Sequence, residues 1–380
     1  MTGSRRRIVM ATIGAALALT AAGCVSSGGS SSAPAAGGTD WKTATSAQAA
    51  GGMDALVAAA KAEGTLNVIA LPPDWANYGA MLKAFTEKYG IKIESANPDG
   101  SSQDEINAVK QLGTQTRAPD VLDVGQSFAN GNIDLYAPYK VATFDKIPAA
   151  NKDANGAWVN DYGGYVSIGC NSKLVPVCPQ TFADLAKPDY KGKVSINGDP
   201  TQAAAAFAGV WAGSLANGGT IDNIQPGLAF WGGLAKSGNL LKLDPNSATI
   251  QSGQSPIVID WDYLNVTETD KNKAAFDWKV VVPSDGLFAQ YYAQAINKNA
   301  PHPAAARLWQ EFLYSDQGQN LWLAGKARPI RLAQMTADGT ADKALVSALP
   351  PVSGEPKFPT QAQADAAQKV VAQNWAATTS

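Results

Sequence analysis

Histidine and arginine are scarce in this 380-residue chain, and the scarcity excludes several kinds of enzyme. The single histidine, His302, stands between two prolines. A zinc site of the HExxH type needs two histidines, and a Ser-His-Asp hydrolase needs one beside its serine, so the composition argues against both. The sequence also lacks a GxxxxGK[ST] phosphate loop and a GxGxxG motif after a strand. We therefore expect no cofactor, no metal ligand and no catalytic residue.

One segment contains part of a hydrolase motif. Residues 125–129 (GQSFA) are similar to the strand–turn–helix motif of serine hydrolases but lack its last glycine. A secreted, lipid-anchored hydrolase remains the alternative to a binding protein.

The N-terminus has the order of a bacterial export signal. Arg5, Arg6 and Arg7 precede an uncharged apolar stretch over residues 8–22, which is shorter than the about 20 residues of a membrane span. Small residues then lead to Cys24, and this arrangement resembles a lipobox, in which the cysteine is acylated. We predict a lipoprotein signal over residues 1–23 and a protein held by lipid at the outer or periplasmic side of the membrane. An ordinary cleaved signal with an incidental cysteine is the alternative, and both the Sec and the twin-arginine route remain open.

The segment that follows has little apolar content. Residues 24–52 are rich in Ser, Gly, Ala and Thr, which predicts a flexible tether. Loss of residues 1–23 moves the net charge from −2 to −5, because three arginines and no acids are removed. This mildly acidic chain has no basic block, so we expect no nucleic-acid partner.

Two cysteines remain after Cys24, namely Cys170 and Cys178. An oxidising compartment favours their pairing, and a disulfide would close a loop of nine residues. Two buried free thiols are the alternative.

Helical and strand patterns alternate along the remaining chain of about 330 residues, which is more than one core usually serves. Residues 65–71 read as a buried strand, and Ser102 with Glu105 reads as the capping box of a helix. The alternation predicts an α/β protein with a mostly parallel sheet and two lobes.

Aromatic and polar residues gather where the predicted strands end, which is where open α/β sheets bind ligands. We predict the ligand-binding residues to be Asp74, Trp75, Asn77, Tyr78, Ser127, Asp199, Thr201, Trp261, Asp262, Tyr263 and Tyr292. Each cluster by itself could be structural, since aromatic residues fill cores and acids cap helices.

The composition of these clusters favours a cationic ligand. Acids, including Asp123, lie beside aromatic faces, and the folded part has only four arginines: Arg117, Arg307, Arg328 and Arg331. Anion sites usually recruit arginine, whereas aromatic faces beside carboxylates suit an organic cation. We therefore favour a polyamine-like or other amine ligand.

Two segments carry a family resemblance. Residues 181–194, TFADLAKPDYKGKV, resemble the "T-w-a-D-L…Y-K-G-K-v" segment of bacterial extracellular solute-binding proteins. Residues 300–319, APHPAAARLWQEFLYSDQGQ, resemble their "A-P-H-P-x-A-A…E-F-L-x-S-x-x-G-Q" helix pair. The chain is similar to the branch that binds polyamines, ferric iron, thiamine and phosphonates for ABC importers.

The resemblance implies a two-lobed, periplasmic-binding-protein-like (type II) fold that closes on its ligand by hinge motion. Lobe 1 would comprise residues 53–162 with 286–330, lobe 2 residues 166–282, and residues 331–380 a C-terminal helical segment. The expected partners are a small solute and ABC permease subunits in the membrane, and the protein is expected to be a monomer. A sensor for a receptor kinase and a ferric-iron, phosphonate or thiamine ligand remain open. Tyr291 and Tyr292 resemble the tyrosine pair of ferric binders, but they follow the return crossing between the lobes.

Overall fold

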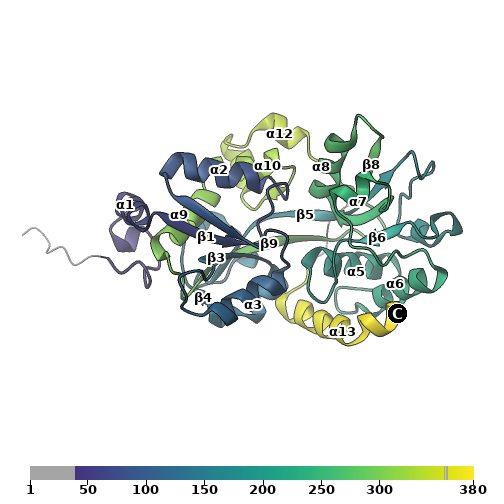
Figure 1. Cartoon of the computed structure of the whole chain (residues 1–380), viewed down its shortest axis with the longest axis horizontal. Helices are drawn as coiled ribbons and strands as arrows, with labels where there is room; N and C mark the ends of the chain where they lie inside the picture. The colour runs from purple at the N-terminus through teal and green to yellow at the C-terminus, as the bar shows by residue number, and fades with distance from the viewer. Residues whose placement is uncertain (1–38, 355, 357) are drawn as a thin grey trace, which may run out of the picture. The chain divides into compact units, whose positions relative to one another are not determined.

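The computed structural model describes residues 39–380 except residues 355 and 357 (Figure 1). Cys24, the predicted signal peptide and residues 24–38 of the predicted tether lie outside the described residues. Within the described part, no helix has the length and apolar character needed to cross a membrane.

The structure alternates strands and helices over most of its length, as the sequence predicts. The strands are β1 (Thr65–Ile69), β2 (Lys92–Ala96), β3 (Val121–Gly125), β4 (Tyr136–Ala137), β5 (Trp158–Asn171), β6 (Val194–Ile196), β7 (Ile257–Trp261), β8 (Trp278–Val281), β9 (Ala289–Asn297) and β10 (Arg328–Pro329). The α-helices are α1 (Met53–Glu63), α2 (Tyr78–Tyr89), α3 (Ser102–Leu112), α4 (Gln126–Gly131), α5 (Ala204–Ala216), α6 (Gln225–Ser237), α7 (Ser247–Gln251), α8 (Asp262–Asn272), α9 (Pro303–Leu313), α10 (Asp316–Ala324), α11 (Leu332–Asp338), α12 (Lys343–Ser347) and α13 (Gln361–Thr379). Short 3-10 helices are η1 (Gln48–Ala50), η2 (Ile133–Leu135), η3 (Phe144–Lys146), η4 (Ala149–Asn151), η5 (Ala183–Ala186) and η6 (Pro188–Tyr190).

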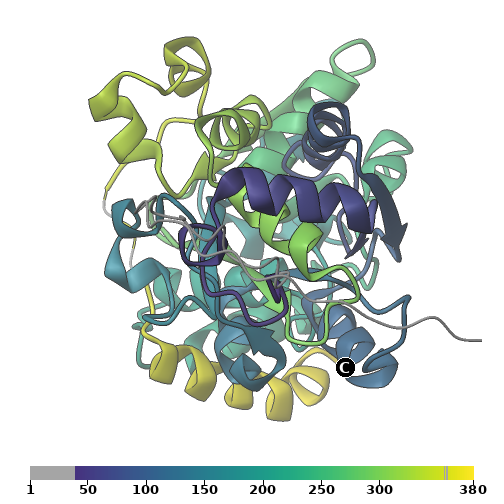
Figure 2. The ribbon, with the colours of Figure 1, turned by 90° about the vertical axis from the view of Figure 1, so that its left-hand side faces the viewer.

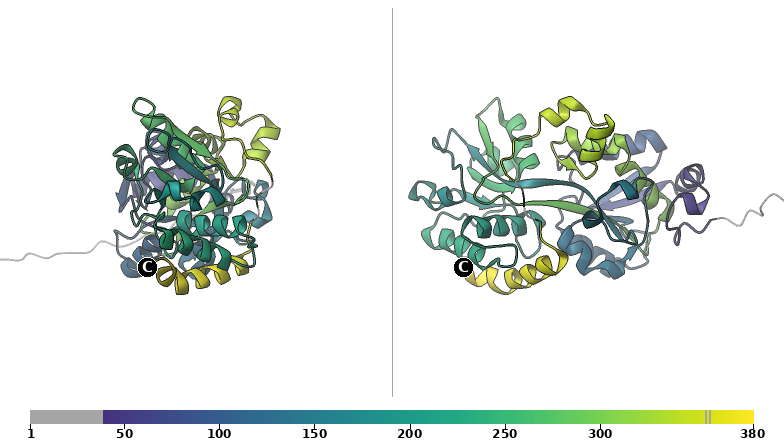
Figure 3. Two further views of the ribbon diagram at one scale, coloured as in Figure 1. Left: turned by 90° about the vertical axis from the view of Figure 1, so that its right-hand side faces the viewer. Right: turned by 180° about the vertical axis from the view of Figure 1, so that it is seen from behind.

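Strand β5 is shared by the two halves of the main sheet. Its first part, Trp158 to Tyr165, pairs with β9, and its second part, Val166 to Asn171, pairs with β7 and β8. The resulting strand order is β3-β9-β5-β7-β6, and β1 and β2 form a separate parallel pair. Seen from behind, β5 and β9 run through the middle of the molecule between the helices of either half (Figure 3, right). The α/β class is therefore confirmed.

The expectation of a mostly parallel sheet is wrong. Only β1 with β2 and β6 with β7 pair in parallel among the described strands, and the other pairings are antiparallel. Strand β9 returns along β5 in the opposite direction, and this antiparallel crossing separates the parallel units from each other.

The start of α3 differs from the predicted cap by one residue. Ser101 is the N-cap, and it exchanges hydrogen bonds with Asp104 in a capping box. Glu105 is thereby left free of capping and turns inward, where its carboxylate accepts the backbone N–H of Asp123 at 2.8 Å. The shift matters for function because it places a buried acid beside β3.

Part of the predicted tether is folded. Trp41, Ala44, Ala47 and Ala50 are buried, and the Arg307 guanidinium on α9 donates to the backbone carbonyls of residues 42 and 44. The interpretation of residues 39–52 as a flexible tether was therefore wrong. Alanines and one tryptophan are enough to pack this segment against the protein, because Arg307 donates hydrogen bonds to its backbone carbonyls. Figure 2 looks onto this end of the molecule, with α1 in front.

Gly163 and Gly164, on the part of β5 where its pairing changes, have a steric role. A Cβ atom at Gly163 would lie 2.4 Å from the backbone oxygen of Gln290, and one at Gly164 would lie 2.5 Å from Asp262 Oδ1. Both positions therefore require glycine because β9 and α8 approach β5 closely there.

The C-terminal segment contains the helices α11, α12 and α13. Helix α13 packs along α6, where Trp375 lies 6.4 Å from Trp231 between ring centroids, and it also contacts α4. Phe358, on the preceding segment, stacks on Tyr291 at 6.1 Å. Residues 350–380 thus run from the crossing strands to the outer face of α6.

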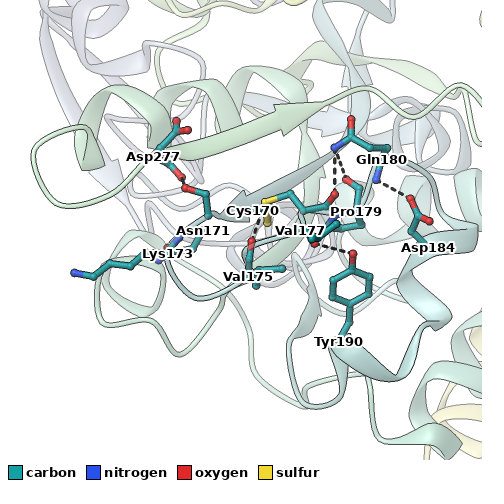
Figure 4. Close-up of a disulfide and its surroundings, with 12 residues drawn as sticks. Cys170, Asn171, Lys173, Val175, Val177, Pro179, Gln180, Asp184, Tyr190 and Asp277 are labelled. Atoms are coloured by element: carbon teal, nitrogen blue, oxygen red, sulfur yellow. Dashed lines mark hydrogen bonds between the residues drawn. A yellow bond between two sulfur atoms is a disulfide. The ribbon is translucent and has the colours of Figure 1, made fainter.

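Cys170 and Cys178 are joined by a disulfide that fixes the loop after β5 (Figure 4). Cys170 is buried at the end of β5, and Tyr190 donates a hydrogen bond to the Val177 carbonyl in the same loop at 2.8 Å. The loop packs beside the edge of β8.

We expect removal of this disulfide to destabilise the protein by about 2.5 kcal/mol, which is the chain-entropy value for a nine-residue loop. Urea unfolding of Cys170→Ser/Cys178→Ser against the parent measures the change. Thiol counting on unfolded, unreduced mature protein should find both sulfurs blocked, and two free thiols would contradict the pairing.

Candidate ligand-binding cleft

A cleft of about 670 Å³ opens where several strands of both halves end. Its lining comes from the loop after β1, the start of α3, the loop after β6 with the start of α5, the segment before α7, and α8. Residues before 162 and residues within 166–282 therefore face each other across it.

The cleft contains four of the predicted ligand-binding residues: Asp74, Trp75, Asp199 and Tyr292. The other seven, Asn77, Tyr78, Ser127, Thr201, Trp261, Asp262 and Tyr263, do not line it. Asp74 is exposed at the mouth, whereas Tyr292 is buried in the floor.

Trp261 and Tyr263 support the cleft from beneath. Both are buried, and Tyr263 packs edge-on against Trp75 at 6.2 Å between centroids. The indole N–H of Trp261 donates to the Tyr292 hydroxyl at 3.2 Å. Trp75 and Tyr292 are thus the cleft-facing members of an aromatic cluster, and Trp261 and Tyr263, which were predicted as ligand contacts, support them from behind.

Asp262 forms an ion pair away from the cleft. Its Oδ2 binds the Arg328 guanidinium, and its Oδ1 accepts the backbone N–H of Tyr165 at 3.0 Å. Arg328 lies on β10, and its other terminal nitrogen donates to the Pro350 carbonyl at 2.9 Å. The pair therefore connects α8 to β10. Asp262 was predicted to contact the ligand, but its carboxylate binds Arg328 instead. Local sequence patterns do not reveal this partner, because it lies 66 residues further along the chain.

The remaining four residues are structural in this fold. Asn77 donates to the Leu321 carbonyl at 2.9 Å, and Thr201 donates to Asp199 Oδ1 at 2.7 Å. Tyr78 and Ser127 are buried. Tyr78 nevertheless acts on the site, because its hydroxyl donates to Asp123 Oδ2 at 2.6 Å.

Asp123 is the central polar group of the floor. Its Oδ2 accepts a second hydrogen bond from the Tyr162 hydroxyl at 3.0 Å, and that hydroxyl accepts the Trp75 indole N–H at 2.8 Å. Its Oδ1 is buried and has no hydrogen-bond partner. No other lining residue in the described ranges has a buried side-chain oxygen without a hydrogen-bond partner.

Burial raises the pKa of the Asp123 carboxyl, and the interactions with Tyr78, Tyr162 and Gln294 offset only part of that effect. Burial likewise raises the pKa of Asp260 to about 8, against the opposing hydrogen bonds from the Trp261 N–H and Asn197. Each half of the cleft therefore presents a carboxyl that holds a proton more tightly than in water.

Acids dominate the lining. The nine carboxyl groups are Asp74, Asp99, Asp104, Glu105, Asp123, Asp199, Asp244, Asp260 and Glu268. Lys271 is the one cation that lines the cleft within the described residues. Sequence reasoning missed Lys271 and Glu268, although a lysine three residues after a glutamate in a polar helix is a readable signal of an ion pair.

The single histidine lies elsewhere. His302 Nδ1 lies 2.8 Å from Asp120 Oδ2, and this hydrogen bond raises the pKa of His302. Asp120 also accepts the Asn67 N–H, so the pair connects β1 to the start of α9. In residues 39–380 without 355 and 357, no three acidic, cysteine or histidine side chains are grouped closely enough to hold a metal ion.

The profile of one protein family, described as "Bacterial extracellular solute-binding protein", matches residues 119–349. The chain belongs to this family. The match ends before α13, so residues 350–380 lie beyond it. A sequence search of curated proteins returns no match.

Solved structures of binding proteins share the fold. Iron-bound HitA from Pseudomonas aeruginosa is 21% identical, with a TM-score of 0.61, over 81% of this chain and 97% of that one. A putative spermidine/putrescine ABC transporter from Listeria monocytogenes is 15% identical, with a TM-score of 0.58, over 75% and 88% of the two chains. The periplasmic binding protein AfuA from Actinobacillus pleuropneumoniae, with bound fructose-6-phosphate, is 16% identical, with a TM-score of 0.64, over 83% and 98%. The type II binding-protein fold is thereby confirmed.

We expect Asp262→Ala to lower the free energy of unfolding by about 3 kcal/mol, because it leaves the Arg328 guanidinium without its buried carboxylate. Chemical denaturation measures the loss, with Asp134→Ala, an exposed acid, as the control. The affinity for ligand of the folded fraction should change little. A variant as stable as the parent that no longer binds ligand would restore Asp262 as a ligand contact.

Proposed function

We propose that this solute-binding protein captures a small cationic amine, polyamine-like or similar, and delivers it to the permease of an ABC importer. It does so as an exported monomer that is anchored by lipid on Cys24. The observation that carries the ligand class is the cleft itself, in which nine carboxyl groups face one lysine. Such a site attracts cations and repels anions.

Asp123 is the proposed anchor for the ammonium group. An ammonium placed against its unpartnered Oδ1 would gain a charge-assisted hydrogen bond at a buried position. The faces of Trp75 and Tyr292 beside it suit the carbon chain and the cation. The hydrogen-bond chain from Trp75 through Tyr162 to Asp123 would hold these groups in place.

Two other ligand classes fit the cleft less well. A phosphonate would meet the acids without an arginine, because Arg117, Arg307, Arg328 and Arg331 are not among its lining residues. For ferric iron, a converging tyrosine pair would be expected, but Tyr291 stacks on Phe358 while Tyr292 faces the cleft.

Capture would proceed by closure of two lobes, residues 53–162 with 286–330 and residues 166–282. Both ranges contribute to the cleft, and they are joined through β5 and the segment that leads into β9. Small-angle scattering should show a smaller radius of gyration when the ligand is bound.

Calorimetry with n-butylamine, putrescine, spermidine, ferric citrate and aminoethylphosphonate tests the ligand class. We expect binding of at least one amine, and Asp123→Asn should weaken it about thirtyfold, which corresponds to about 2 kcal/mol for a hydrogen bond to a charged group. Asp134→Asn serves as the matched control. Binding of the phosphonate without any of the amines, or unchanged amine affinity in Asp123→Asn, would contradict the proposal. A turnover screen on esters, glycosides and phosphates tests the alternative of a hydrolase.

Amine affinity should depend on pH. Asp123 and Asp260 have raised pKa values in the free protein, Asp260 near 8, and a cation binds their ionised forms. Affinity should therefore increase as the pH rises from 6 to 9, while a primary amine with a pKa near 10.4 stays largely charged. Calorimetry in buffers of different ionisation enthalpy should detect proton release on binding at pH 7. An affinity that stays constant over this range would show that neither carboxyl contacts the cation.

A further inference from the structure

Lys271 holds its ammonium group at the mouth of the cleft by three contacts. Its Nζ lies 2.6 Å from Asp74 Oδ2, 2.8 Å from Ser247 Oγ and 3.0 Å from Glu268 Oε1. An ammonium group has three N–H donors, so the lysine is completely satisfied by these oxygens. The arrangement is that of a bound primary amine whose carbon chain happens to belong to the protein.

Buried contacts hold Lys271 and its partner Glu268 in place. Glu268 is buried, and its second oxygen accepts a hydrogen bond from Asn272 at 2.9 Å. The Lys271 side chain is only 28% exposed. Burial alone would lower the pKa of Lys271, but the hydrogen bonds to Asp74 and Glu268 outweigh it and raise the pKa, so the group stays charged at neutral pH.

A second candidate position for a cation lies in the floor of the same cleft. Asp123 is one of the lining residues, and its Oδ1 is buried without a hydrogen-bond partner. The cleft therefore contains one acidic group that is paired with an ammonium of the protein itself and a second acidic group, Asp123, that is not. The two differ in origin, because α8 supplies Lys271 and Glu268 whereas β3 supplies Asp123.

We propose that Lys271 is a built-in ammonium that occupies one of two cation positions in the cleft and makes it select a solute with a single ammonium group over a diamine. This inference rests on the proposed amine ligand and, within that class, favours a monoamine over a polyamine-like solute. A diamine would have to displace Lys271 from its three oxygens or place its second ammonium beside it, and like charges repel strongly where they are partly desolvated. A monoamine would meet Asp123 without that conflict.

The test compares matched ligands on matched variants. Calorimetry measures the dissociation constants of n-butylamine, n-pentylamine, 1,4-diaminobutane and 1,5-diaminopentane for the mature protein, Lys271→Met and Lys271→Arg. We expect the affinity of the diamines relative to the monoamines to rise at least tenfold in Lys271→Met, which keeps the chain length but removes the charge. Lys271→Arg should keep the preference of the parent. Lys83→Met removes an exposed lysine that pairs with Glu87 and should also leave the preference unchanged.

The outcomes separate this inference from the proposed function. If the parent binds amines and the preference is the same in Lys271→Met, the role of Lys271 is refuted while the ligand class stands. If neither protein binds any amine, both fail. Lys271→Ala provides a second readout should Lys271→Met fold poorly: millimolar n-butylammonium should raise its Tm more than that of Lys83→Ala, because the free cation replaces the missing side chain in addition to binding at Asp123. An equal effect on both variants would count against a formed ammonium position.

Discussion

The sharing of β5 between the two halves of the main sheet is the constraint on which the other features depend. Antiparallel pairing with β9 on its first part and with β7 on its second part fixes both halves to one strand. The end of β3 and the ends of β6 and β7 line the same cleft as a result of that arrangement. The close approach of β9 and α8 to this strand explains why Gly163 and Gly164 cannot carry a side chain. The crossing is thus tightly packed at Gly163 and Gly164, although glycine by itself would suggest a flexible backbone there.

Sequence patterns predicted the class of fold and the general position of the cleft, because hydrophobic alternation and strand-end clusters are local signals. They did not predict which way each side chain points. In the cluster after β7, Trp261 and Tyr263 turn into the aromatic core and Asp262 turns toward Arg328, while Asp260 before them lines the cleft. Each choice depends on a partner far along the chain, such as Tyr292 for Trp261. The same limit applies to residues 39–52, whose low apolar content predicted a tether but which pack once Arg307 supplies donors for their carbonyl groups.

The cleft concentrates acids that are expensive to leave ionised in its interior. The charge of Asp123 raises the pKa of the nearby buried Glu105 and Asp161, in addition to the larger effect of desolvation. Nearby hydroxyl groups and backbone N–H groups satisfy some of their oxygens, but not Asp123 Oδ1 or Asp161 Oδ2. A buried acceptor without a partner in the chain costs about 1–3 kcal/mol, a penalty that a cationic donor on Asp123 would remove. Binding energy would then come partly from relief of this unfavourable arrangement and not only from new contacts.

The ion pair between Lys271 and Asp74 also lies in the cleft, but it contributes little to stability. Asp74 belongs to the loop after β1 and Lys271 to α8, so the ion pair connects the two ranges that line the cleft. The Asp74 side chain is 60% exposed, and a pair with one solvated partner contributes at most about 1 kcal/mol, too little to hold the cleft closed by itself. Its effect on charge is larger than its effect on stability, because it places a fixed cation beside the buried Glu268. Lys271 would therefore act mainly on which solutes the remaining acids can accept, and much less on the stability of the cleft.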